Sequence, residues 1–204
     1  LIATEDIRFR SHSGIDVKSL ARAIIGAFFG DGQTGGASTI TQQLSKMLFT
    51  KTPASGIERI KQKLKEWVIS AKLERRYTKE EILLMYLNRF DWVNNAVGIK
   101  SAARVYFNKK TRNLNVQESA MLVGMLKNPS LFNPNRRLEL TKKRRDVVLS
   151  QMRKYSFIAD TLYDSLVKTP IILDFKKASH NEGLAPYFRE YLREKMKKWC
   201  STKI

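Results

Sequence analysis

The sequence of 204 residues is poor in the residue types that build disulfide frameworks and metal centres. It contains one cysteine, Cys200, and two histidines, His12 and His180. A single cysteine excludes a disulfide framework within the chain and a cysteine-cluster zinc site. The two histidines are too far apart for a local metal motif.

Long apolar runs are also lacking. No stretch approaches the roughly 18 residues that a membrane-spanning helix needs, so we expect nothing in this sequence to cross a bilayer unaided. The sequence opens at Leu1-Ile2-Ala3 with neither an initiator methionine nor a signal peptide. It therefore reads as a part of a longer protein.

Negative charge is scarce as well. There are 38 Lys and Arg residues against 19 Asp and Glu, a formal net charge of +19, while 43% of the residues are hydrophobic. That hydrophobic fraction excludes a disordered basic tail, and the length fits one or two domains with a real core. The charge predicts an anionic partner, and nucleic acid, anionic lipid headgroups and phosphorylated substrates satisfy it equally.

Strand signals are few, and helical periodicity dominates. The segment 31–36 (DGQTGG) is typical of a polar loop, and only 170–176 (PIILDFK) is predicted to be extended. The fold class is therefore mostly α, with one lobed domain over 1–168 and, over 169–204, an extended connector and a terminal basic helix. Apolar spacing and capping signals predict helices over 17–29, 38–49, 56–76, 78–87, 96–107, 115–126, 139–155, 159–167 and 184–199.

A first polar cluster lies near the start of the chain, at Glu5, Asp6, Phe9 and His12. Two acids, an aromatic ring and an imidazole within ten residues suit general acid–base chemistry. The same residues are compatible with a helix-capping acid and a surface histidine. Composition alone leaves both interpretations open.

A second polar cluster lies in the predicted helix 38–49. Thr39, Gln43 and Lys46 fall on one stripe at about 100° per residue, and Thr39 and Gln42 have capping-box spacing. Helix N-terminal N–H groups behind a glycine-rich loop suit an anion or a sugar-phosphate. An ordinary capped amphipathic helix with a solvated polar stripe fits the spacing equally well.

The predicted helix 56–76 carries a third cluster, in which Glu66 is a lone acid on a basic stripe. By itself this charge pattern favours a solvated face with i,i+3 pairing. One face holds Arg59, Gln62, Lys63, Glu66 and Ser70, and the opposite face holds Ile57, Ile60, Leu64, Trp67, Val68 and Ala71.

Taken together, these segments resemble the peptidoglycan glycosyltransferase domain (glycosyltransferase family 51) of class A, bifunctional penicillin-binding proteins. The first cluster is similar to the family's EDxxFxxHxG signature, which continues to Gly14. Residues 36–46 are similar to GxSTxTQQLxKN, with Met47 in place of Asn. Lys63 and Glu66 are similar to RKxxE, with Gln62 in place of Arg. Further similar motifs lie at 86–88, 98–109, 118–124, 129–134 and 144–149, while residues 89–95 replace a loop that usually contains glycine.

The resemblance implies a lysozyme-like, bilobed helical domain that polymerises lipid II into glycan strands. The anomeric carbon would be inverted and undecaprenyl pyrophosphate released. Glu5 would take the proton of the attacking sugar hydroxyl. Glu66 would hold cations in place, ligate a metal or protonate the leaving group. The residues implied to bind the substrate are Asp6, Phe9, His12, Ser38, Thr39, Gln42, Gln43, Lys46, Arg59 and Lys63.

Cofactors and partners follow from the same resemblance. A divalent cation, Mg²⁺ or Mn²⁺, near Glu66 stays open, and no organic cofactor is expected. The expected partners are lipid II and the growing glycan chain, the membrane surface, moenomycin-type inhibitors and other cell-wall synthesis proteins, but not nucleic acid. The implied location is the outer face of the bacterial cytoplasmic membrane, with an anchoring helix before residue 1, and residues 169–204 would lead to a transpeptidase domain that is absent here.

Periodicity leaves one membrane question open. A set of apolar residues either dips into the membrane interface beside Lys18 and Arg22 or packs in the protein core. The set comprises Ile24, Ile25, Phe28, Phe29, Met47, Leu48 and Phe49.

Two other functions remain as alternatives. A lytic transglycosylase or muramidase would also be mostly helical with an essential glutamate, but it has no pyrophosphate for the TQQLxK motif to hold. A basic helical module that binds nucleic acid would explain the charge, but not why Glu5, Asp6 and Glu66 lie in the best-patterned segments.

Overall fold

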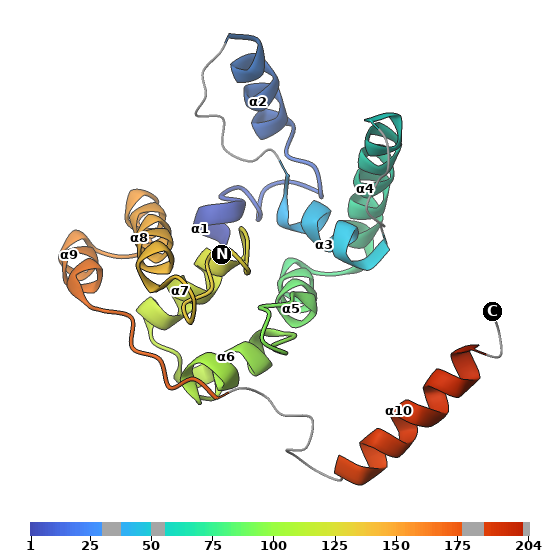
Figure 1. The fold of residues 1–204 in the computed structure, drawn as a ribbon. Helices are drawn as coiled ribbons and strands as arrows, with labels where there is room; N and C mark the ends of the chain where they lie inside the picture. Colours follow the sequence, from blue (N-terminus) through green and yellow to red (C-terminus); the bar gives the residue numbers. More distant parts are fainter. Residues whose placement is uncertain (30–37, 50–55, 177–185, 202–204) are drawn as a thin grey trace.

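The computed structural model describes residues 1–29, 38–49, 56–176 and 186–201, and helices make up most of them (Figure 1). Within these ranges no β-strand occurs, and one isolated bridge joins Asp91 and Val97. The mostly α class is thereby confirmed. The helices are α1 (Ile2–Glu5), α2 (Val17–Phe29), α3 (Ile40–Phe49), α4 (Gly56–Arg76), α5 (Lys79–Arg89), α6 (Ile99–Phe107), the 3-10 helix η1 (Thr111–Asn113), α7 (Val116–Met125), α8 (Leu138–Lys154), α9 (Asp160–Lys168) and α10 (Pro186–Ser201).

The helix boundaries follow from local capping signals. Thr78 and Glu81 form a reciprocal capping box that starts α5, and Asn115 and Glu118 form another that starts α7. At α3 the expected box is half formed. Thr39 Oγ1 accepts the Gln42 N–H, whereas the side-chain oxygen Oε1 of Gln42 is buried without a hydrogen-bond partner among the described residues. The predicted loop 31–36 lies outside the described residues.

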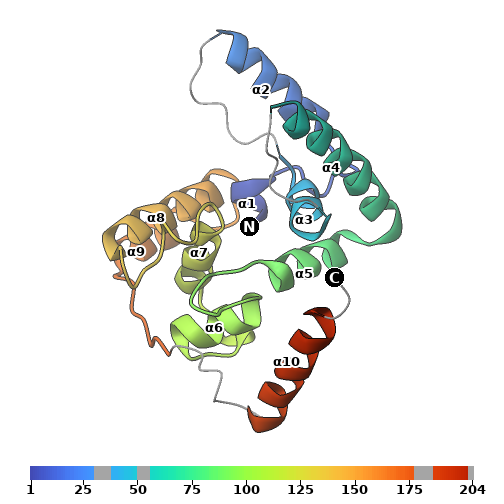
Figure 2. The ribbon, with the colours of Figure 1, turned by 45° about the vertical axis from the view of Figure 1, so that its right-hand side comes forward.

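The helices form two groups that meet at α7. The main core joins α3, α5, α6 and α7 through buried residues such as Leu44, Tyr86, Tyr106 and Met121. A smaller cluster around Val148 joins α7, α8 and α9. Figures 1 and 2 show α8 and α9 on one side of the molecule, α3, α4 and α5 on the other, and α1 between them.

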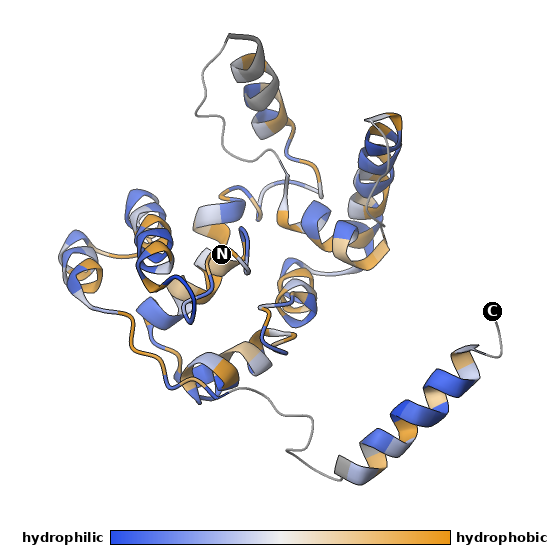
Figure 3. Cartoon of the chain, in the orientation of Figure 1, coloured by the Kyte–Doolittle hydropathy of each residue, from blue (hydrophilic) through white to orange (hydrophobic). Residues whose placement is uncertain are grey.

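The segment 170–176 is not helical, as predicted, but no strand pairs with it among the described residues. Its side chains alternate, because Ile171, Leu173 and Phe175 pack against the main core and Ile172 is exposed. It shows as a mostly orange stretch after α9 in Figure 3. Residues 171–175 therefore pack against the same core as the helices before them.

The loop before α6 reaches its turn without the glycines expected there. Val93, Asn94 and Asn95 all have positive φ, at 57°, 52° and 63°. Buried Trp92 donates from its indole to the Leu122 carbonyl at 2.9 Å, and the Tyr106 hydroxyl donates to the Trp92 carbonyl at 2.7 Å. Asparagine tolerates this left-handed backbone, whereas valine does so at a cost of about 1–2 kcal/mol, so these anchors hold the turn.

Helix α4 is turned opposite to the expectation from its charge pattern. Its polar face points inward, with Glu66 and Ser70 4% and 0% exposed, and its apolar face points outward. Ile57, Ile60, Leu64 and Val68 on that apolar face are 53–69% exposed. The solvated polar face favoured by the sequence is therefore wrong for Glu66.

Among the described residues, no helix has both the length and the apolarity needed to cross a membrane. All described side chains of α10 are exposed, and this helix carries both blue and orange residues in Figure 3.

Helix α2 is capped by an acid that is also paired. The Asp16 carboxylate accepts the Ser19 N–H and is bidentate to the Arg8 guanidinium at 2.6–3.0 Å. Burial alone would raise the pKa of Asp16, but the hydrogen bonds from Arg8 and Ser19 outweigh it and lower the pKa to about 2.

We expect Asp16→Asn to lower the melting temperature at neutral pH by about 2–4 °C, because asparagine keeps the cap but loses the ion pair. The pKa of Asp16 in the folded state lies below its ordinary value of 3.8. The contribution of the ionised Asp16 carboxylate to the stability of the fold is thus present above pH 4 and lost as pH falls towards 2. Melting curves at both pH values check this. An equal deficit at pH 2, or the same neutral-pH shift in exposed Asp164→Asn, would contradict it.

Candidate active site

The candidate site is assembled on α3. The segment that carries the first polar cluster docks against the start of this helix, and α4 packs beside it. Ile40 and Gln43 lie one turn apart on the same face of α3. Consecutive acids of the docked segment bind these two positions, Asp6 at Ile40 and Glu5 at Gln43.

Asp6 is the buried anchor of this docking. Its Oδ2 accepts the Ile40 N–H at 3.0 Å, and both oxygens lie within 3.0 Å of His12 Nε2. Since the Gly14 N–H donates to His12 Nδ1 at 3.2 Å, Nε2 is the ring nitrogen that carries a proton and donates to Asp6. The carboxylate therefore caps α3 and fixes the orientation of the imidazole.

Glu5 is held by its neighbours but not enclosed. The side-chain amide of Gln43 donates to Glu5 Oε2 at 3.1 Å, and the Tyr86 hydroxyl donates to the side-chain oxygen Oε1 of Gln43 at 2.9 Å. Tyr86 therefore fixes which end of the Gln43 amide faces Glu5. Burial first, and then the negative charge of Glu5, raise the pKa of Tyr86, so its hydroxyl stays a donor. The Glu5 side chain keeps 17% exposure, which leaves it accessible.

Arg144 of α8 brings a positive charge to Glu5 from the other helix group. Its Nη2 lies 3.8 Å from Glu5 Oε1, and its Nε donates to the Gly124 carbonyl at 3.3 Å. Burial lowers the pKa of Arg144, and the charge of Glu5 opposes that shift. The sequence offered Arg144 and Tyr86 only as members of motifs, and nothing in their local pattern links them to Glu5.

Close backbone contact explains Gly14. It has a φ of +91°, and a Cβ there would lie 2.9 Å from the Ser70 backbone of α4. Its carbonyl accepts the Thr39 hydroxyl at 2.7 Å. Small side chains on α3 and α4 allow this close packing. Ser45 of α3 and Ser70 of α4 face each other, and their hydroxyls hydrogen-bond at 2.9 Å. The docked segment is thereby held between α3 and α4.

Glu66 forms the second part of the site. Its oxygens accept the Gln62 amide at 2.9 Å and the Lys63 ammonium at 3.2 Å. Lys63 also donates to Ser38 Oγ at 3.0 Å, directly before α3. Glu66 thus holds Lys63 at the N-terminal end of the helix that carries Gln43.

Gln62 keeps the contact to Glu66 but brings no charge. Arg59, one turn earlier, is exposed and forms no hydrogen bond or ion pair within the described ranges. Lys46 is exposed on α3.

Several residues expected to bind substrate are instead buried against protein. Asp6, Phe9, Thr39 and Gln42 are each no more than 7% exposed, and the His12 side chain is 7% exposed. Phe9 packs in the core with the Lys79 ammonium 4.5 Å above its ring. These side chains position the site, whereas Glu5, Gln43 and Lys63 remain partly accessible.

The start of α3 is also not an open anion site. Asp6 takes the Ile40 N–H and the Thr39 hydroxyl takes the Gln42 N–H. A carboxylate from the chain itself already occupies the positive end of the helix. Of the two interpretations left open by the sequence, the capped helix therefore describes these two N–H groups, while Gly36 of the same motif lies outside the described residues.

The residues around Glu66 do not fit a divalent cation. Both of its oxygens already accept hydrogen bonds, and one donor is an ammonium. Within the described ranges, no three His, Cys, Asp or Glu residues come together as a metal cluster. A cation at Glu66 would have to displace Lys63, so we assign no chemical step to a metal.

Comparison with known proteins places this geometry in context. The sequence model of a family described as Transglycosylase matches residues 1–153. The chain is 37% identical over 195 residues to penicillin-binding protein 1A of Haemophilus influenzae, covering 96% of this chain and 22% of that protein. It is 36% identical over 191 residues to penicillin-binding protein 1F of Bacillus subtilis, covering 94% and 26%. The chain thus spans about a quarter of the length of these relatives.

Among solved structures, a crystal structure of penicillin-binding protein 1A from Haemophilus influenzae is similar. It shares 28% sequence identity and a TM-score of 0.47, and the match covers 78% of this chain and 19% of that one.

We expect Asp6→Asn to destabilise the fold by about 1.5–3 kcal/mol, the range for a buried hydrogen bond to a charged group. In asparagine an NH2 group replaces one carboxylate oxygen. At the Oδ1 position it faces the His12 Nε2–H, and at the Oδ2 position it faces both that group and the Ile40 N–H, so a donor meets a donor in either orientation. Urea unfolding measures the change, with exposed Asp164→Asn as the control. A change below about 0.5 kcal/mol, or an equal one in the control, would show that Asp6 is not the anchor.

Proposed function

The chain belongs to the transglycosylase family, and from this premise we propose that it is a peptidoglycan glycosyltransferase. It would polymerise lipid II into glycan strands, inverting the anomeric carbon and releasing undecaprenyl pyrophosphate. One observation carries the proposal. The start of α3 holds an accessible carboxylate, Glu5, through Gln43 and a carboxylate-bound ammonium, Lys63, through Ser38.

Glu5 has the geometry of a general base. Its Oε2 is held by Gln43 at 3.1 Å, while Oε1 faces Arg144 at 3.8 Å, beyond hydrogen-bond reach. Oε1 therefore has a lone pair available for the 4-hydroxyl of the acceptor sugar. A sugar hydroxyl is a weak nucleophile, so removal of its proton as it attacks the anomeric carbon supports the transfer. Arg144 places a positive charge beside this carboxylate, 3.8 Å from Oε1.

Lys63 is the residue we assign to the leaving group. The departing pyrophosphate gains negative charge, which a preoriented ammonium stabilises. Glu66 is buried and fixes this ammonium between itself and Ser38. These contacts support the positioning of Lys63 as the role of Glu66, in preference to metal ligation or protonation of the leaving group. Lys46 and Arg59, both exposed, add positive charge for the approaching substrate.

The membrane would meet this protein on α4. Ile57, Ile60, Leu64 and Val68 expose an apolar stripe, and exposed Lys61 and Lys65 lie beside it. Apolar side chains flanked by lysines suit an interface of acyl chains and anionic headgroups. The net charge of +19 would also attract the protein to anionic headgroups.

Two further segments support the same placement. On α2, Ile25 is 57% exposed beside exposed Lys18 and Arg22, and on α3, Leu48 and Phe49 are 39% and 60% exposed. Figures 1 and 2 show α2 and α4 extending from the same end of the molecule. Met47 instead packs against the core, and the side chains of Ile24, Phe28 and Phe29 lie outside the described residues.

The remaining expectations concern the whole protein. We propose that it acts at the outer face of the bacterial cytoplasmic membrane, anchored by a helix before residue 1. Residues 169–204 would lead to a transpeptidase domain. Moenomycin-type inhibitors, which mimic the donor, would compete for the site, and other cell-wall synthesis proteins would associate with it. The coverage of the penicillin-binding relatives, about a quarter of their length, supports a larger protein.

The activity test uses labelled lipid II with the wild type, Glu5→Gln and the control Glu80→Gln, a glutamate in an exposed ion pair with Arg10. We expect polymer from the wild type and the control, and a 10²–10⁴-fold lower rate from Glu5→Gln, the usual loss for a general base. Gel separation of the glycan strands measures the product. Polymerisation by Glu5→Gln near the wild-type rate would refute the assignment of the base. Cleavage of preformed glycan without polymerisation would favour a lytic enzyme.

The membrane proposal is tested with vesicles of phosphatidylethanolamine and phosphatidylglycerol. We expect the double substitution Ile60→Glu and Leu64→Glu to weaken vesicle binding at least tenfold, because each apolar side chain contributes about 1.5–3 kcal/mol when it leaves water. Co-sedimentation measures binding. The matched control, Phe157→Glu with Leu162→Glu, changes exposed residues of the α8–α9 group. Equal losses in both double variants would mean that charge alone drives binding.

A further inference from the structure

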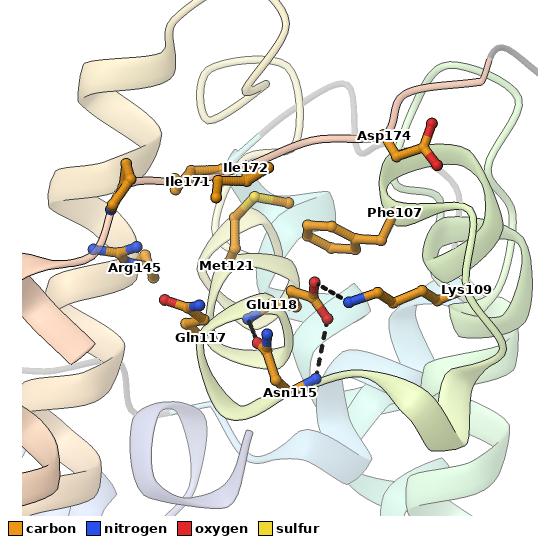
Figure 4. Close-up of a pocket in the computed structure, with 11 residues that line it drawn as sticks. Phe107, Lys109, Asn115, Gln117, Glu118, Met121, Arg145, Ile171, Ile172 and Asp174 are labelled. Carbon is orange, nitrogen blue, oxygen red and sulfur yellow. Dashed lines mark hydrogen bonds and ion pairs between the residues drawn. The ribbon is translucent and has the colours of Figure 1, made fainter. Parts of the chain in front are cut away.

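A cavity of about 270 Å³ lies between α6, α7, α8 and the extended segment 170–176 (Figure 4). None of its lining residues belongs to the candidate active site. Buried Phe107 and Met121 form its apolar wall, and the Lys109–Glu118 ion pair, at 2.6 Å, lies at its edge. Ligand pockets usually measure about 300–1,000 Å³, so this volume suits one large apolar side chain better than a whole small molecule.

The segment 170–176 forms one wall of this cavity and has an unused backbone edge. Among the described residues, no backbone hydrogen bond involves the N–H or carbonyl groups of residues 171–175. Ile172, at the mouth of the cavity, is 76% exposed. An extended segment with free backbone groups is a template for pairing with another strand.

The edge is fixed at both ends. Arg145 Nη1 donates to the Thr169 carbonyl at 2.9 Å, and the Lys176 N–H donates to the Val105 carbonyl at 2.8 Å. The Phe175 ring packs against Tyr106 with centroids 5.8 Å apart. A partner strand would therefore meet a preformed edge. Little conformational entropy of residues 170–176 would be lost on binding, because this segment is already held in place.

The surroundings of this edge are positively charged. Residues 109–118 and 168–176 contain Lys109, Lys110, Arg112, Lys168 and Lys176 against two acids. Of these acids, Glu118 is paired with Lys109, and Asp174 accepts the Asn108 amide. An approaching chain with acidic residues would be favoured.

We propose that residues 170–176 and the adjacent cavity form a docking site for an extended, acidic peptide segment of another protein. The peptide adds as a strand to residues 171–175 and places one large apolar side chain in the cavity against Phe107 and Met121. This is strand addition, in which backbone pairing supplies affinity and the pocket supplies specificity. The site is independent of the activity proposed for Glu5.

The probe is a fluorescein-labelled heptapeptide, Glu-Val-Thr-Phe-Thr-Val-Glu, titrated into the 204-residue chain by fluorescence anisotropy. We expect binding that weakens at least tenfold when alanine replaces the central phenylalanine. Lysine in place of the terminal glutamates should weaken it as well. A peptide N-methylated on alternate amides, which cannot pair with a strand, should not bind. No binding by the parent peptide, or equal binding by the N-methylated one, would overturn the proposal.

Hydrogen exchange separates strand pairing from adhesion to a basic surface. The amides of residues 171–175 should exchange rapidly in the free protein and become at least tenfold slower with the parent peptide. Ile172→Pro removes one exposed donor and should abolish binding, whereas exposed Leu162→Glu in α9 should not change it. Peptide binding without protection of residues 171–175, or undiminished binding to Ile172→Pro, would refute strand addition.

Discussion

The buried carboxylate of Asp6 is the interaction on which the arrangement of the site depends. Burying a charge is costly, and here the cost is offset by charge-assisted hydrogen bonds from the first N–H of α3 and from His12. Since Glu5 precedes Asp6 in the chain, fixing Asp6 at Ile40 brings Glu5 beside Gln43, one turn along the same helix. The Glu5 carboxylate is thus positioned through its neighbour, and it stays partly exposed because its own burial is not needed to hold it.

The same docking explains why α4 turns its polar face inward. This face must pass close to the backbone at Gly14 and to α3, so it carries small hydroxyl residues, Ser70 against Ser45, and the Glu66 carboxylate with its own donors. Glu66 and Ser70 are both hydrogen-bonded, and their burial is therefore tolerated. The apolar residues of α4 are left exposed, and a contiguous apolar surface of this kind is typical of a region that meets a partner or a membrane.

Local signals predicted the fold well, and non-local contacts limited the prediction of the site. The bounds of α2, α4 and α5 follow from periodicity and caps, whereas α1 and η1 are too short to show a period. Hydropathy could not predict the orientation of α4, because its apolar stripe is the exposed one. Motif resemblance selected Glu5 and Glu66 but did not separate accessible residues from buried positioning residues such as Phe9 and Thr39. Arg144 was missed as a partner of Glu5 because the two meet only through the packing of α1 on α8.

Adjacent arginines of α8 have separate tasks. Arg144 lies beside Glu5. Arg145 is fully buried and paired with Asp146, and it donates hydrogen bonds to the carbonyls of Val167 and Thr169, where the chain leaves α9. Because these residues are adjacent on one helix, the same part of α8 contacts Glu5 and the carbonyls at the end of α9. One short stretch of α8 thus ties together two parts of the chain that lie far apart in the sequence, the segment around Glu5 and the exit from α9.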